Sequence, residues 1–427
     1  MAYQKPKGTQ DILPGTVEKW HYIENKARDL CRRFHYKEIR TPIFEQTELF
    51  QRGVGETTDI VEKEMYTFLD KGERSMTLRP EGTAGVVRAY VENKLYGEPD
   101  ISKLYYIGPM FRYEQPQAGR YRQLHQFGVE LIGTLDPGAD AEVIALGYLF
   151  YKELGIQQVT VEINSLGNAQ SRNAYRSKLL EFLLPLKDKL CKDCRSRIER
   201  NPLRVLDCKV DQEQFAGAPS ILDSLDEEST RHFAAVQEGL AAMGIPYRVN
   251  PRLVRGLDYY THTAFEYKAQ GIGAIDTIGA GGRYNGLVSE IGGPEQPGIG
   301  FGIGLERTLL ILDHQGIELP SPPPLDAYII PLGERAEKEA VKLLFALRQA
   351  GFAAEKDYQG KKIKAQLKAA DRAGARFALI LGDDELDRGL VAAKKLATGE
   401  QSVIPVSEIY TYLNKEQGRD QHDVKNA

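Results

Sequence analysis

The pattern of apolar and polar positions divides the chain near residue 320. Upstream, residues 15–36 carry apolar side chains with a helical period, and residues 170–245 are also helical in pattern. Strand-like stretches recur at residues 37–52, 104–112, 122–133, 158–164, 247–255, 262–269 and 275–279. Because their spacing is that of hairpins, we predict a predominantly antiparallel sheet in a domain of residues 1–322. Residues 170–245 are expected to be a helical insertion in that domain.

A proline-rich run at residues 320–324 separates a second unit, because such a run forms a stiff extended linker. Strands and helices then alternate, which predicts a small α/β domain with a mostly parallel sheet over residues 325–415. The polar tail, residues 416–427, is expected to be flexible. The predicted elements are strand 325–332, helix 334–351, strand 352–357, helix 361–374, strand 375–383, hairpin 390–405 and a helix near 407–414.

Composition narrows the functional classes. No apolar run in the 427 residues is long enough to span a bilayer, and the N-terminus has no secretory apolar region. We therefore expect a cytoplasmic protein with no membrane partner. The net charge of −4 does not indicate nucleic-acid binding, so a locally basic surface would have to provide it.

The densest group of chemically active side chains lies in LVRGLDYYTHTAFEY, residues 253–267. Its aromatic and β-branched residues predict a strand, on which Arg255 shares a face with Tyr259 while Tyr260 points the other way. A guanidinium beside phenols suits a small anionic or amphoteric ligand. The alternative is a solvated strand with an ordinary Arg–Asp pair.

A second group lies in residues 77–90. Glu81 and Thr83 stand in a turn between a predicted strand and a predicted helix, where side chains and free amides can bind an amine. The alternative is a helix N-cap with a capping acid.

A third group lies on a predicted hairpin, residues 108–133. A period of two brings Arg112, Glu114, Gln126 and Glu130 around one pocket. Arginines such as Arg112 and Arg120 suit a polyphosphate, and a buried carboxylate with a glutamine suits an amine or imidazole. A solvent-exposed charged hairpin is the alternative.

Two glycine-rich segments complete the candidate chemistry. Residues 278–293 place Tyr284 beside a flexible turn. Glycine at every second position of residues 298–304 leaves one strand face bare, as a flat ligand or a packed helix requires. Arg307 falls in the first turn of the following helix, where a cation costs roughly 0.3–1 kcal/mol, so a phosphate or a base is expected to stabilise it.

The cysteines allow two interpretations. Cys191, Cys194 and Cys208 supply three of the four ligands of a zinc site, and Asp193, Asp207, His232 or a more distant residue would have to supply the fourth. The more common interpretation is a set of reduced thiols.

Several of these segments resemble one family. FRYE with GRYRQLHQFGVE resembles motif 2 of class II aminoacyl-tRNA synthetases, GIGFGIGLER resembles motif 3, and the segment around Pro42 resembles motif 1. LVRGLDYYTHTAFE and GAGGRYNGL resemble the signature peptides of histidyl-tRNA synthetases. Residues 325–415 resemble an anticodon-binding domain. The resemblance implies an α+β fold: a class II antiparallel-sheet catalytic domain with a helical insertion, and a C-terminal α/β anticodon-binding domain.

The resemblance also implies a ligase that activates L-histidine with ATP and Mg²⁺ and transfers it to the 3′ end of tRNA(His). Because motif 1 builds the dimer interface of this class, a homodimer is expected. One alternative is a histidine-binding regulatory paralogue, such as the regulatory subunit of ATP phosphoribosyltransferase. A class II synthetase for another amino acid is a second alternative.

Carried over by position, Arg112 would hold the α-phosphate and Glu114 the adenine amino group. Arg307 would stack on adenine and reach the γ-phosphate, with Arg120 as a further phosphate contact. The family usually has an aromatic residue where this chain has Leu124, which predicts weaker stacking on adenine, by about 0.5–1.5 kcal/mol.

The same resemblance implies the amino-acid site, with Arg255 and Arg112 as the catalytic residues. Arg255 would touch the substrate carboxylate and the α-phosphate together. The other implied contacts are Glu81, Thr83 and Gln126 for the α-amino group, Glu130, Tyr260 and Tyr284 for the imidazole, and Tyr259 for the pocket wall.

For tRNA, residues 356–376 contain seven Lys or Arg against two Asp. We predict that Lys361, Lys362 and Lys364 form a basic face for tRNA phosphates. A solvated helix face is the alternative.

Overall fold

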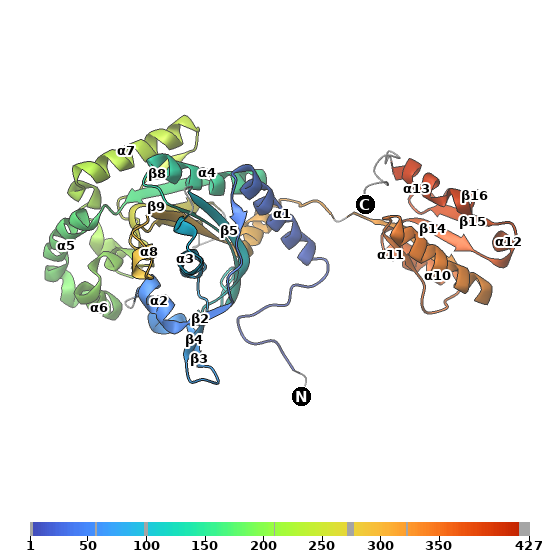
Figure 1. Cartoon of the computed structure of the whole chain (residues 1–427), viewed down its shortest axis with the longest axis horizontal. Helices are drawn as coiled ribbons and strands as arrows, with labels where there is room; N and C mark the ends of the chain where they lie inside the picture. Colours follow the sequence, from blue (N-terminus) through green and yellow to red (C-terminus); the bar gives the residue numbers. More distant parts are fainter. Residues whose placement is uncertain are drawn as a thin grey trace. The chain divides into compact units, whose positions relative to one another are not determined.

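The computed structural model describes residues 3–55, 58–97, 101–208, 210–270, 277–321 and 323–417. It divides into two compact units, Met1–Pro320 and Ser321–Ala427 (Figure 1). Most of the tail predicted to be flexible, from residue 418 onward, lies outside the described residues, as do residues 275 and 276 of one predicted strand.

The first unit is built on a large sheet. In the described residues this sheet has eight strands in the order β1-β5-β6-β11-β10-β9-β7-β8. The pairs from β5 to β7 are antiparallel, and only the two edge pairs, β1 with β5 and β7 with β8, are parallel. The predicted antiparallel sheet is therefore confirmed. The strands are β1 (Lys37–Glu38), β5 (Ser102–Phe111), β6 (Gln123–Ile132), β7 (Thr160–Ser165), β8 (Tyr247–Val249), β9 (Thr261–Lys268), β10 (Thr277–Arg283) and β11 (Gly298–Gly304).

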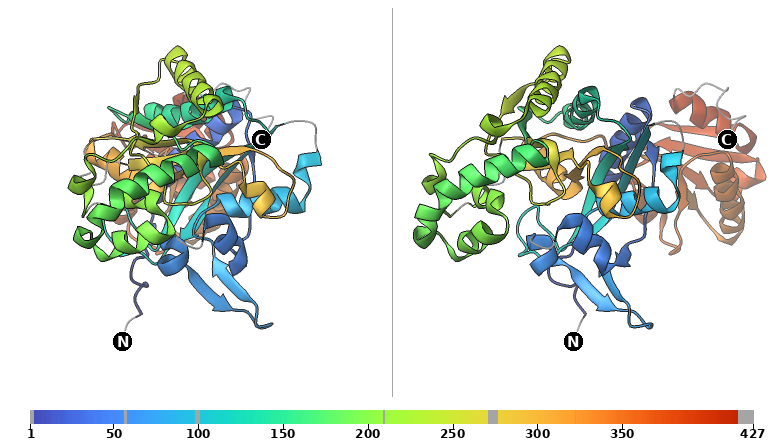
Figure 2. Two further views of the ribbon diagram at one scale, coloured as in Figure 1. Left: turned by 90° about the vertical axis from the view of Figure 1, so that its left-hand side faces the viewer. Right: turned by 60° about the vertical axis from the view of Figure 1, so that its left-hand side comes forward.

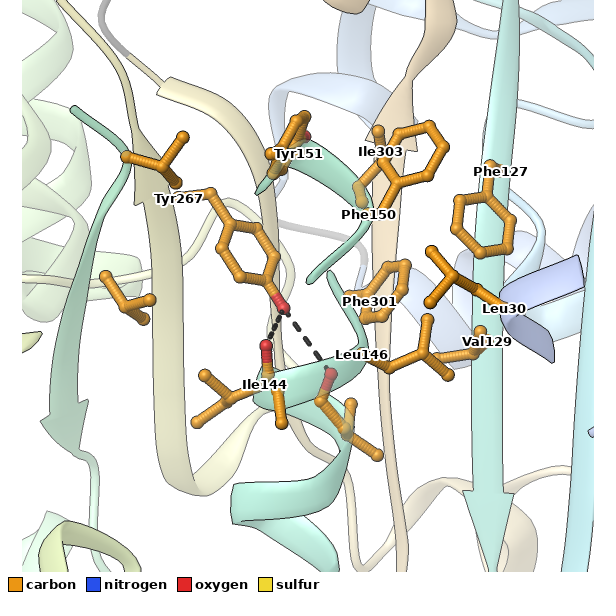
Figure 3. Close-up of a cluster of buried hydrophobic side chains, with 14 of the residues drawn as sticks. Leu30, Phe127, Val129, Ile144, Leu146, Phe150, Tyr151, Tyr267, Phe301 and Ile303 are labelled. Carbon is orange, nitrogen blue, oxygen red and sulfur yellow. Dashed lines mark hydrogen bonds between the residues drawn. The ribbon is translucent and has the colours of Figure 1, made fainter. Parts of the chain in front are cut away.

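The two faces of this sheet have different roles, which strand β6 shows most clearly. Phe127 and Val129 point into the main hydrophobic core, together with Phe301 of β11 (Figure 3). The alternate positions Gln126 and Glu130 are therefore on the opposite face. One face thus packs the core while the other is available for polar chemistry.

Helices α1, α4 and α9 contribute side chains to that core. Tyr267 of β9 reaches across it and donates its hydroxyl to the carbonyl of Ile144 in α4, at 3.0 Å (Figure 3). Helix α4 is absent from the sequence-based prediction. Its start is nevertheless encoded, because Asp136 accepts a hydrogen bond from the amide of Gly138 at 2.7 Å and Pro137 occupies the first helical turn.

The remaining elements of the unit extend from this layer. A small antiparallel sheet, in the order β2-β4-β3, projects from the body of the unit (Figures 1 and 2). The helices of residues 169–242 gather on one side of the unit (Figure 1). These small-sheet strands are β2 (Phe44–Gln46), β3 (Tyr66–Leu69) and β4 (Ser75–Leu78). The α-helices are α1 (Val17–Arg33), α2 (Thr47–Val54), α3 (Thr83–Glu92), α4 (Pro137–Glu153), α5 (Ala169–Leu183), α6 (Lys192–Arg200), α7 (Glu227–Ala242), α8 (Leu287–Glu290) and α9 (Leu305–His314).

Two strand predictions are wrong in this unit. Residues 47–52 begin helix α2, because their apolar positions follow a helical period and bury Phe50. The stretch 253–260 is a loop, and the strand begins at Thr261. Its backbone bonds to other segments, as when the Asp258 amide donates to the Val54 carbonyl at 3.1 Å. The local pattern of aromatic residues therefore did not determine the backbone there.

In the second unit the described residues form a five-stranded sheet in the order β13-β12-β14-β15-β16. Strand β12 pairs in parallel with β13 and β14, whereas β15 pairs antiparallel with both of its neighbours. The predicted mostly parallel sheet is thus mixed, because the predicted hairpin joins the sheet as two antiparallel strands. The elements are β12 (Leu325–Pro331), α10 (Glu334–Gln349), β13 (Ala354–Lys356), α11 (Ile363–Arg372), β14 (Ala375–Leu381), α12 (Asp383–Asp387), β15 (Leu390–Lys395), β16 (Gln401–Pro405) and α13 (Ile409–Gln417).

Candidate active site

A cavity of about 430 Å³ opens on the polar face of the large sheet. The sequence-predicted residues that line it are Arg112, Glu114, Arg120, Leu124, Gln126, Arg255 and Arg307. They come from the β5–β6 hairpin, from the loop before β9 and from the first turn of α9. Four guanidinium groups around one cavity make it suited to a polyanion.

Two of the four arginines are held in place by backbone carbonyls. Arg112 donates from Nε to the Pro80 carbonyl at 2.8 Å, and Arg307 donates from Nη1 to the Thr277 carbonyl at 3.0 Å. Arg120 lies 3.3 Å from the carboxylate of Glu114. Burial lowers the pKa of Arg307. Each carbonyl leaves other N–H groups of the fork available to a ligand.

Arg255 pairs with a carboxylate inside the cavity. Its Nη1 lies 2.5 Å from Oε1 of Glu266, and its guanidinium lies 5.8 Å from the ring centre of Tyr260. Although burial disfavours the charged carboxylate, Arg255 and Lys268 hold the pKa of Glu266 below its ordinary value. Since residues 253–260 are not a strand, the predicted shared strand face of Arg255 and Tyr259 does not exist; the loop and Glu266 orient Arg255 instead.

A second group of predicted residues forms a buried polar cluster. Glu130 is fully buried and accepts hydrogen bonds from Thr83 Oγ1 at 2.8 Å and from Tyr284 Oη at 2.6 Å. Burial raises the pKa of Glu130 to about 8, against the opposing effect of these two donors. Glu130 is not among the residues that line the arginine-rich cavity, contrary to the prediction of one common pocket. The cluster and the cavity are neighbours, because Arg255, which lines the cavity, lies 5.8 Å from the ring centre of Tyr260 beside the cluster.

Glu81 closes this cluster at the N-terminus of α3. Its carboxylate accepts hydrogen bonds from the amides of Thr83 at 2.7 Å and Ala84 at 2.8 Å. Desolvation raises the pKa of Glu81 despite these bonds. The capping role considered from the sequence is thus present. It also places Glu81 beside Thr83, the same threonine that donates to Glu130, although the two acids are 49 positions apart in the chain.

Three buried tyrosines surround the carboxyl groups. The ring of Tyr259 lies 4.7 Å from that of Tyr260 and 5.9 Å from that of Tyr284, measured between centres. All three hydroxyl-bearing rings are buried, and burial raises their pKa values. Tyr106 of β5, which the sequence analysis did not single out, packs over the glycines of the neighbouring turn and strand.

The alternating glycines of β11 make room for these side chains. A Cβ at Gly300 would lie 2.1 Å from Oε2 of Glu130, so a larger residue there would displace the carboxyl group. A Cβ at Gly302 would have the side chain of Gln126 as its nearest neighbour, at 3.7 Å, and Gly302 lines the cavity. The bare strand face expected from the sequence thus serves both a buried acid and the cavity floor.

Sequence reasoning missed several cavity residues. Glu266 and Lys268 lie on one face of β9. Glu266 belongs to the quoted motif and Lys268 follows it directly, so their period of two was a signal that could have identified them. Asp207, which was considered only as a zinc ligand, also lines the cavity. The carboxylate of Glu306 accepts a hydrogen bond from the backbone amide of His125 at 2.9 Å and thereby links α9 to β6.

The predicted zinc ligands partly converge. Cys191, Cys194 and Cys208 lie together, but the fourth group beside them is Asp211. Of the three ligands suggested from the sequence, His232 lies 3.3 Å from the buried Asp140 instead. Asp193 does not belong to the cysteine cluster found in the described part of the chain.

In the second unit, Lys362 and Lys364 are exposed and Lys361 is half-buried. They stand at the start of α11, where the Lys361 amide donates to the carboxylate of Asp357 at 3.0 Å. The three lysines are therefore close together on the surface of this unit.

In the described residues no helix is long and apolar enough to cross a membrane.

The family model described as histidyl-tRNA synthetase matches residues 8–308, which include every residue of the cavity and the buried cluster. The chain belongs to the histidyl-tRNA synthetase family. A second model, described as an anticodon binding domain, matches residues 326–416. Members of this family use ATP as a substrate.

Relatives of similar length support the assignment. Histidine–tRNA ligase of Geobacillus sp. (strain WCH70) is 57% identical over 97% of this chain and 99% of its own length. That of Geobacillus kaustophilus (strain HTA426) is 57% identical over 99% of this chain and 100% of its own. The crystal structure of apo histidyl-tRNA synthetase of S. aureus covers 96% of this chain and 100% of its own, at 46% identity and a TM-score of 0.83.

A more distant structure shares the fold alone. It is described as an ATP phosphoribosyltransferase regulatory subunit/histidyl-tRNA synthetase from Bacillus halodurans, with 22% identity and a TM-score of 0.66 over 89% of this chain and 98% of its own. The regulatory alternative is thus less well supported than the synthetase.

Proposed function

We propose that this chain is a histidine–tRNA ligase, which activates L-histidine with ATP to histidyl-adenylate and transfers it to the 3′ end of tRNA(His). The observation that carries the proposal is the placement of a buried acid cluster, Glu130 with Tyr284, next to a cavity with four arginines. One compartment suits a polar ring with N–H groups, and the other suits a triphosphate.

Adenylate formation brings two anions together, because the histidine carboxylate attacks the α-phosphate of ATP. In our proposal Arg112 contacts the α-phosphate, and Arg255 contacts the carboxylate and the α-phosphate together. Both guanidinium groups are already oriented, by Pro80 and by Glu266, so little reorganisation is needed as charge develops. No protein nucleophile takes part, since the substrate carboxylate itself attacks.

Selectivity for histidine would arise in the buried cluster. Glu130, Tyr260 and Tyr284 would pair with the imidazole nitrogens, and Tyr259 would form the wall beside them. Two hydroxyl donors hold the carboxyl group of Glu130 in place, and its remaining lone pairs would accept from an imidazole N–H. An apolar side chain would bury this capacity without a donor. A site of this kind rejects an analogue without the polar group by roughly 10⁴–10⁵-fold.

The α-amino group would lie among Glu81, Thr83 and Gln126. Glu81 and Thr83 are fixed at the start of α3, and Gln126 lines the cavity. An ammonium group is stabilised by a carboxylate and by hydroxyl or amide oxygens. This position places the amine between the imidazole compartment and the cavity for ATP.

ATP would occupy the arginine-lined cavity. Glu114 would accept from the adenine amino group, Arg307 would stack on the base and reach the γ-phosphate, and Arg120 would contact a further phosphate. Mg²⁺ would enter with the triphosphate, and the carboxylates of Glu114, Asp207 and Glu266 line the same cavity.

The second unit would bind the anticodon region of tRNA through Lys361, Lys362 and Lys364. Exposed ammonium groups at one helix end can neutralise neighbouring phosphates although the whole chain is acidic. We also propose a homodimer in the cytoplasm. Light scattering that gives the mass of a single chain at micromolar concentration would contradict the dimer.

Pyrophosphate–ATP exchange with each of the twenty amino acids tests the activity. We expect exchange with histidine alone, and a loss of about 10²–10³-fold in Arg255→Ala. Arg252→Ala is the matched control, because Arg252 is exposed and donates to the Ala216 carbonyl at 2.8 Å, away from the cavity. Histidine binding by calorimetry without exchange would instead indicate a regulatory paralogue.

A further inference from the structure

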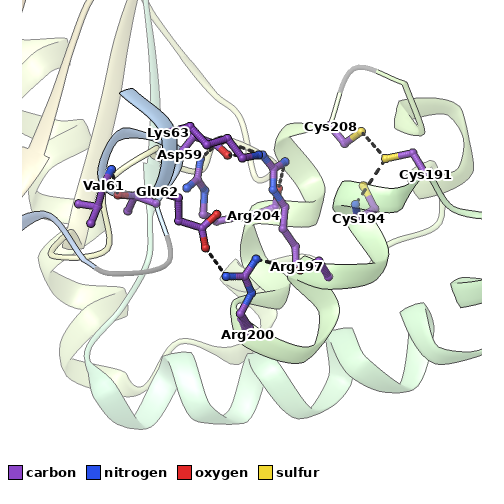
Figure 4. Close-up of polar contacts among 12 residues, drawn as sticks. Asp59, Val61, Glu62, Lys63, Cys191, Cys194, Arg197, Arg200, Arg204 and Cys208 are labelled. Atoms are coloured by element: carbon purple, nitrogen blue, oxygen red, sulfur yellow. Dashed lines mark hydrogen bonds and ion pairs between the residues drawn. The ribbon is translucent and has the colours of Figure 1, made fainter. Parts of the chain in front are cut away.

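Three cysteines and an aspartate converge in the helical part of the first unit, outside the cavity described above. Cys191, Cys194, Cys208 and Asp211 place their ligand atoms within 4.8 Å of one another. Figure 4 shows the three sulfur atoms pointing toward a common centre. Cys194, Cys208 and Asp211 are buried, so the centre is largely shielded from water.

The distances within this group fit a tetrahedral metal ion. Metal–sulfur bonds of about 2.3 Å in a tetrahedron put neighbouring sulfur atoms about 3.8 Å apart. The Sγ atoms of Cys191 and Cys208 are 3.9 Å apart, and Cys208 Sγ lies 3.8 Å from Asp211 Oδ2. A disulfide would require about 2.05 Å between the sulfur atoms.

We propose that Cys191, Cys194, Cys208 and Asp211 bind a structural Zn²⁺ ion. Three thiolates and a carboxylate are ligands that zinc accepts, and four protein ligands leave no open position for a substrate. The aspartate takes the place that the sequence pattern C-x₂-C with one further cysteine left unassigned.

Hydrogen bonds around the group support anionic ligands. The Cys194 amide, in the first turn of α6, donates to Cys191 Sγ at 3.4 Å, and the Cys191 amide donates to Asp211 Oδ2 at 3.0 Å. Gln214 donates from Nε2 to the other carboxylate oxygen at 3.4 Å. Such outer contacts orient metal ligands and stabilise their negative charge.

The segment that the ion would close consists mostly of short helical elements. Between the outer ligands lie the nine-residue helix α6 and a short 3₁₀ turn, Pro202–Asp207. A small segment with a limited core gains stability from a metal cross-link. The ion would therefore hold residues 191–211 as one folded loop.

This loop forms ion pairs with another segment of the same unit. Arg197 and Arg204 lie 2.8 and 3.1 Å from the carboxylate of Asp59, and Arg200 pairs with Glu62 (Figure 4). Asp207, directly before Cys208, lines the arginine-rich cavity. A metal that fixes this loop would thus also fix one wall of the cavity.

Metal analysis of the full-length chain, purified under reducing conditions from zinc-containing medium, tests the proposal. We expect about one zinc per chain in the wild type and a loss of most of it in Cys208→Ser and Asp211→Asn. Cys31→Ser is the matched control, because Cys31 is a buried free cysteine of α1 and should leave the metal content unchanged. A wild type without zinc would overturn the proposal.

Cobalt substitution gives a readout that does not depend on variants or on activity. Co²⁺ bound to the metal-free wild type should show the intense visible bands of a tetrahedral site and a thiolate charge-transfer band, and Zn²⁺ should abolish both. Weak octahedral bands, or an intact mass two hydrogens lower that indicates a Cys191–Cys208 disulfide, would contradict a zinc site. Asp211→Asn retains all three thiols, so it reports on the site even if Cys208→Ser does not fold.

Discussion

Tyr284 donates its phenolic hydroxyl to the fully buried carboxyl group of Glu130, with 2.6 Å between Oη and Oε2. Desolvation outweighs this bond and the one from Thr83, and the pKa of Glu130 rises to about 8. The group is therefore largely uncharged at neutral pH. A ligand with polar N–H groups would replace part of the solvation that Glu130 loses on folding.

The raised pKa of Glu130 predicts a pH-dependent effect of Glu130→Gln. Between the ordinary value of 4.5 and about 8, the folded protein keeps a proton that the unfolded chain has released. The free energy of unfolding of the wild type therefore falls as pH rises through this window. The glutamine variant lacks this loss. The melting temperature of the variant minus that of the wild type should therefore increase up to about pH 8 and stay constant at higher pH.

Thermal denaturation of both proteins across this range measures the difference, and histidine-dependent exchange should be strongly reduced in the variant. Glu295→Gln, which changes an exposed carboxylate, is the control and should follow the wild type at every pH. If the melting temperatures of Glu130→Gln and the wild type changed in parallel with pH, Glu130 would be ionised in the folded protein throughout this pH range.

Leu124 predicts a gain of ATP affinity on substitution by an aromatic residue. It lines the cavity together with Arg307, whose guanidinium we place on the adenine. Leu124→Phe should lower the KM for ATP roughly 2- to 10-fold, the equivalent of about 0.5–1.5 kcal/mol of stacking. Steady-state exchange kinetics measure this, with the KM for histidine as the internal control. An unchanged KM for ATP would remove adenine from the neighbourhood of Leu124.

Much of the site could be predicted where chemistry and periodicity coincide in one strand. In β6 the apolar positions Phe127 and Val129 alternate with Gln126 and Glu130, so the sequence itself separates the core face from the polar face. The alternating glycines that begin at Gly298 were equally visible. The resemblance to the family then assigned roles that alternation alone could not.

Other features depended on contacts that are distant in sequence. Helix α4 was missed because it is apolar on most sides, with Ile144 and Phe150 buried alike, so no amphipathic period marks it. Asp211 is different, because it lies only three positions after Cys208, and a search for carboxylates beside the cysteines could have found it. The loop before β9 was misassigned because its backbone partners, such as Val54, lie on other segments.

The buried pair Arg283–Asp140 predicts a large loss of stability when one charge is removed. Both side chains are fully buried and lie 2.7 Å apart, and Arg283 also donates to the carbonyls of Thr134 and Asp136. Arg283→Met would leave the carboxylate without its partner and should cost about 3–5 kcal/mol.

Denaturant unfolding measures this loss. Lys19→Met, which removes the exposed partner of Asp313, is the matched control and should cost less than about 1 kcal/mol. The double variant with Asp140→Leu should recover part of the loss, because no unpaired charge remains. Equal effects of Arg283→Met and Lys19→Met would contradict a structural role of the buried pair.

Charge reversal at Lys361, Lys362 and Lys364 should separate the two half-reactions. These lysines lie in the second unit, whereas every residue assigned to adenylate formation lies in the first. Aminoacylation of tRNA should fall, whereas pyrophosphate–ATP exchange should stay unchanged. The slope of the logarithm of the tRNA-binding constant against the logarithm of the salt concentration should decrease in magnitude by roughly one for each lost phosphate contact. The same reversal at Arg335, Lys338 and Lys342, all exposed on α10, changes the net charge equally, and as the control it should have a smaller effect. Equal loss in both half-reactions would mean that the three lysines support folding rather than tRNA binding, because a phosphate contact in this unit has no part in the chemistry of the adenylate.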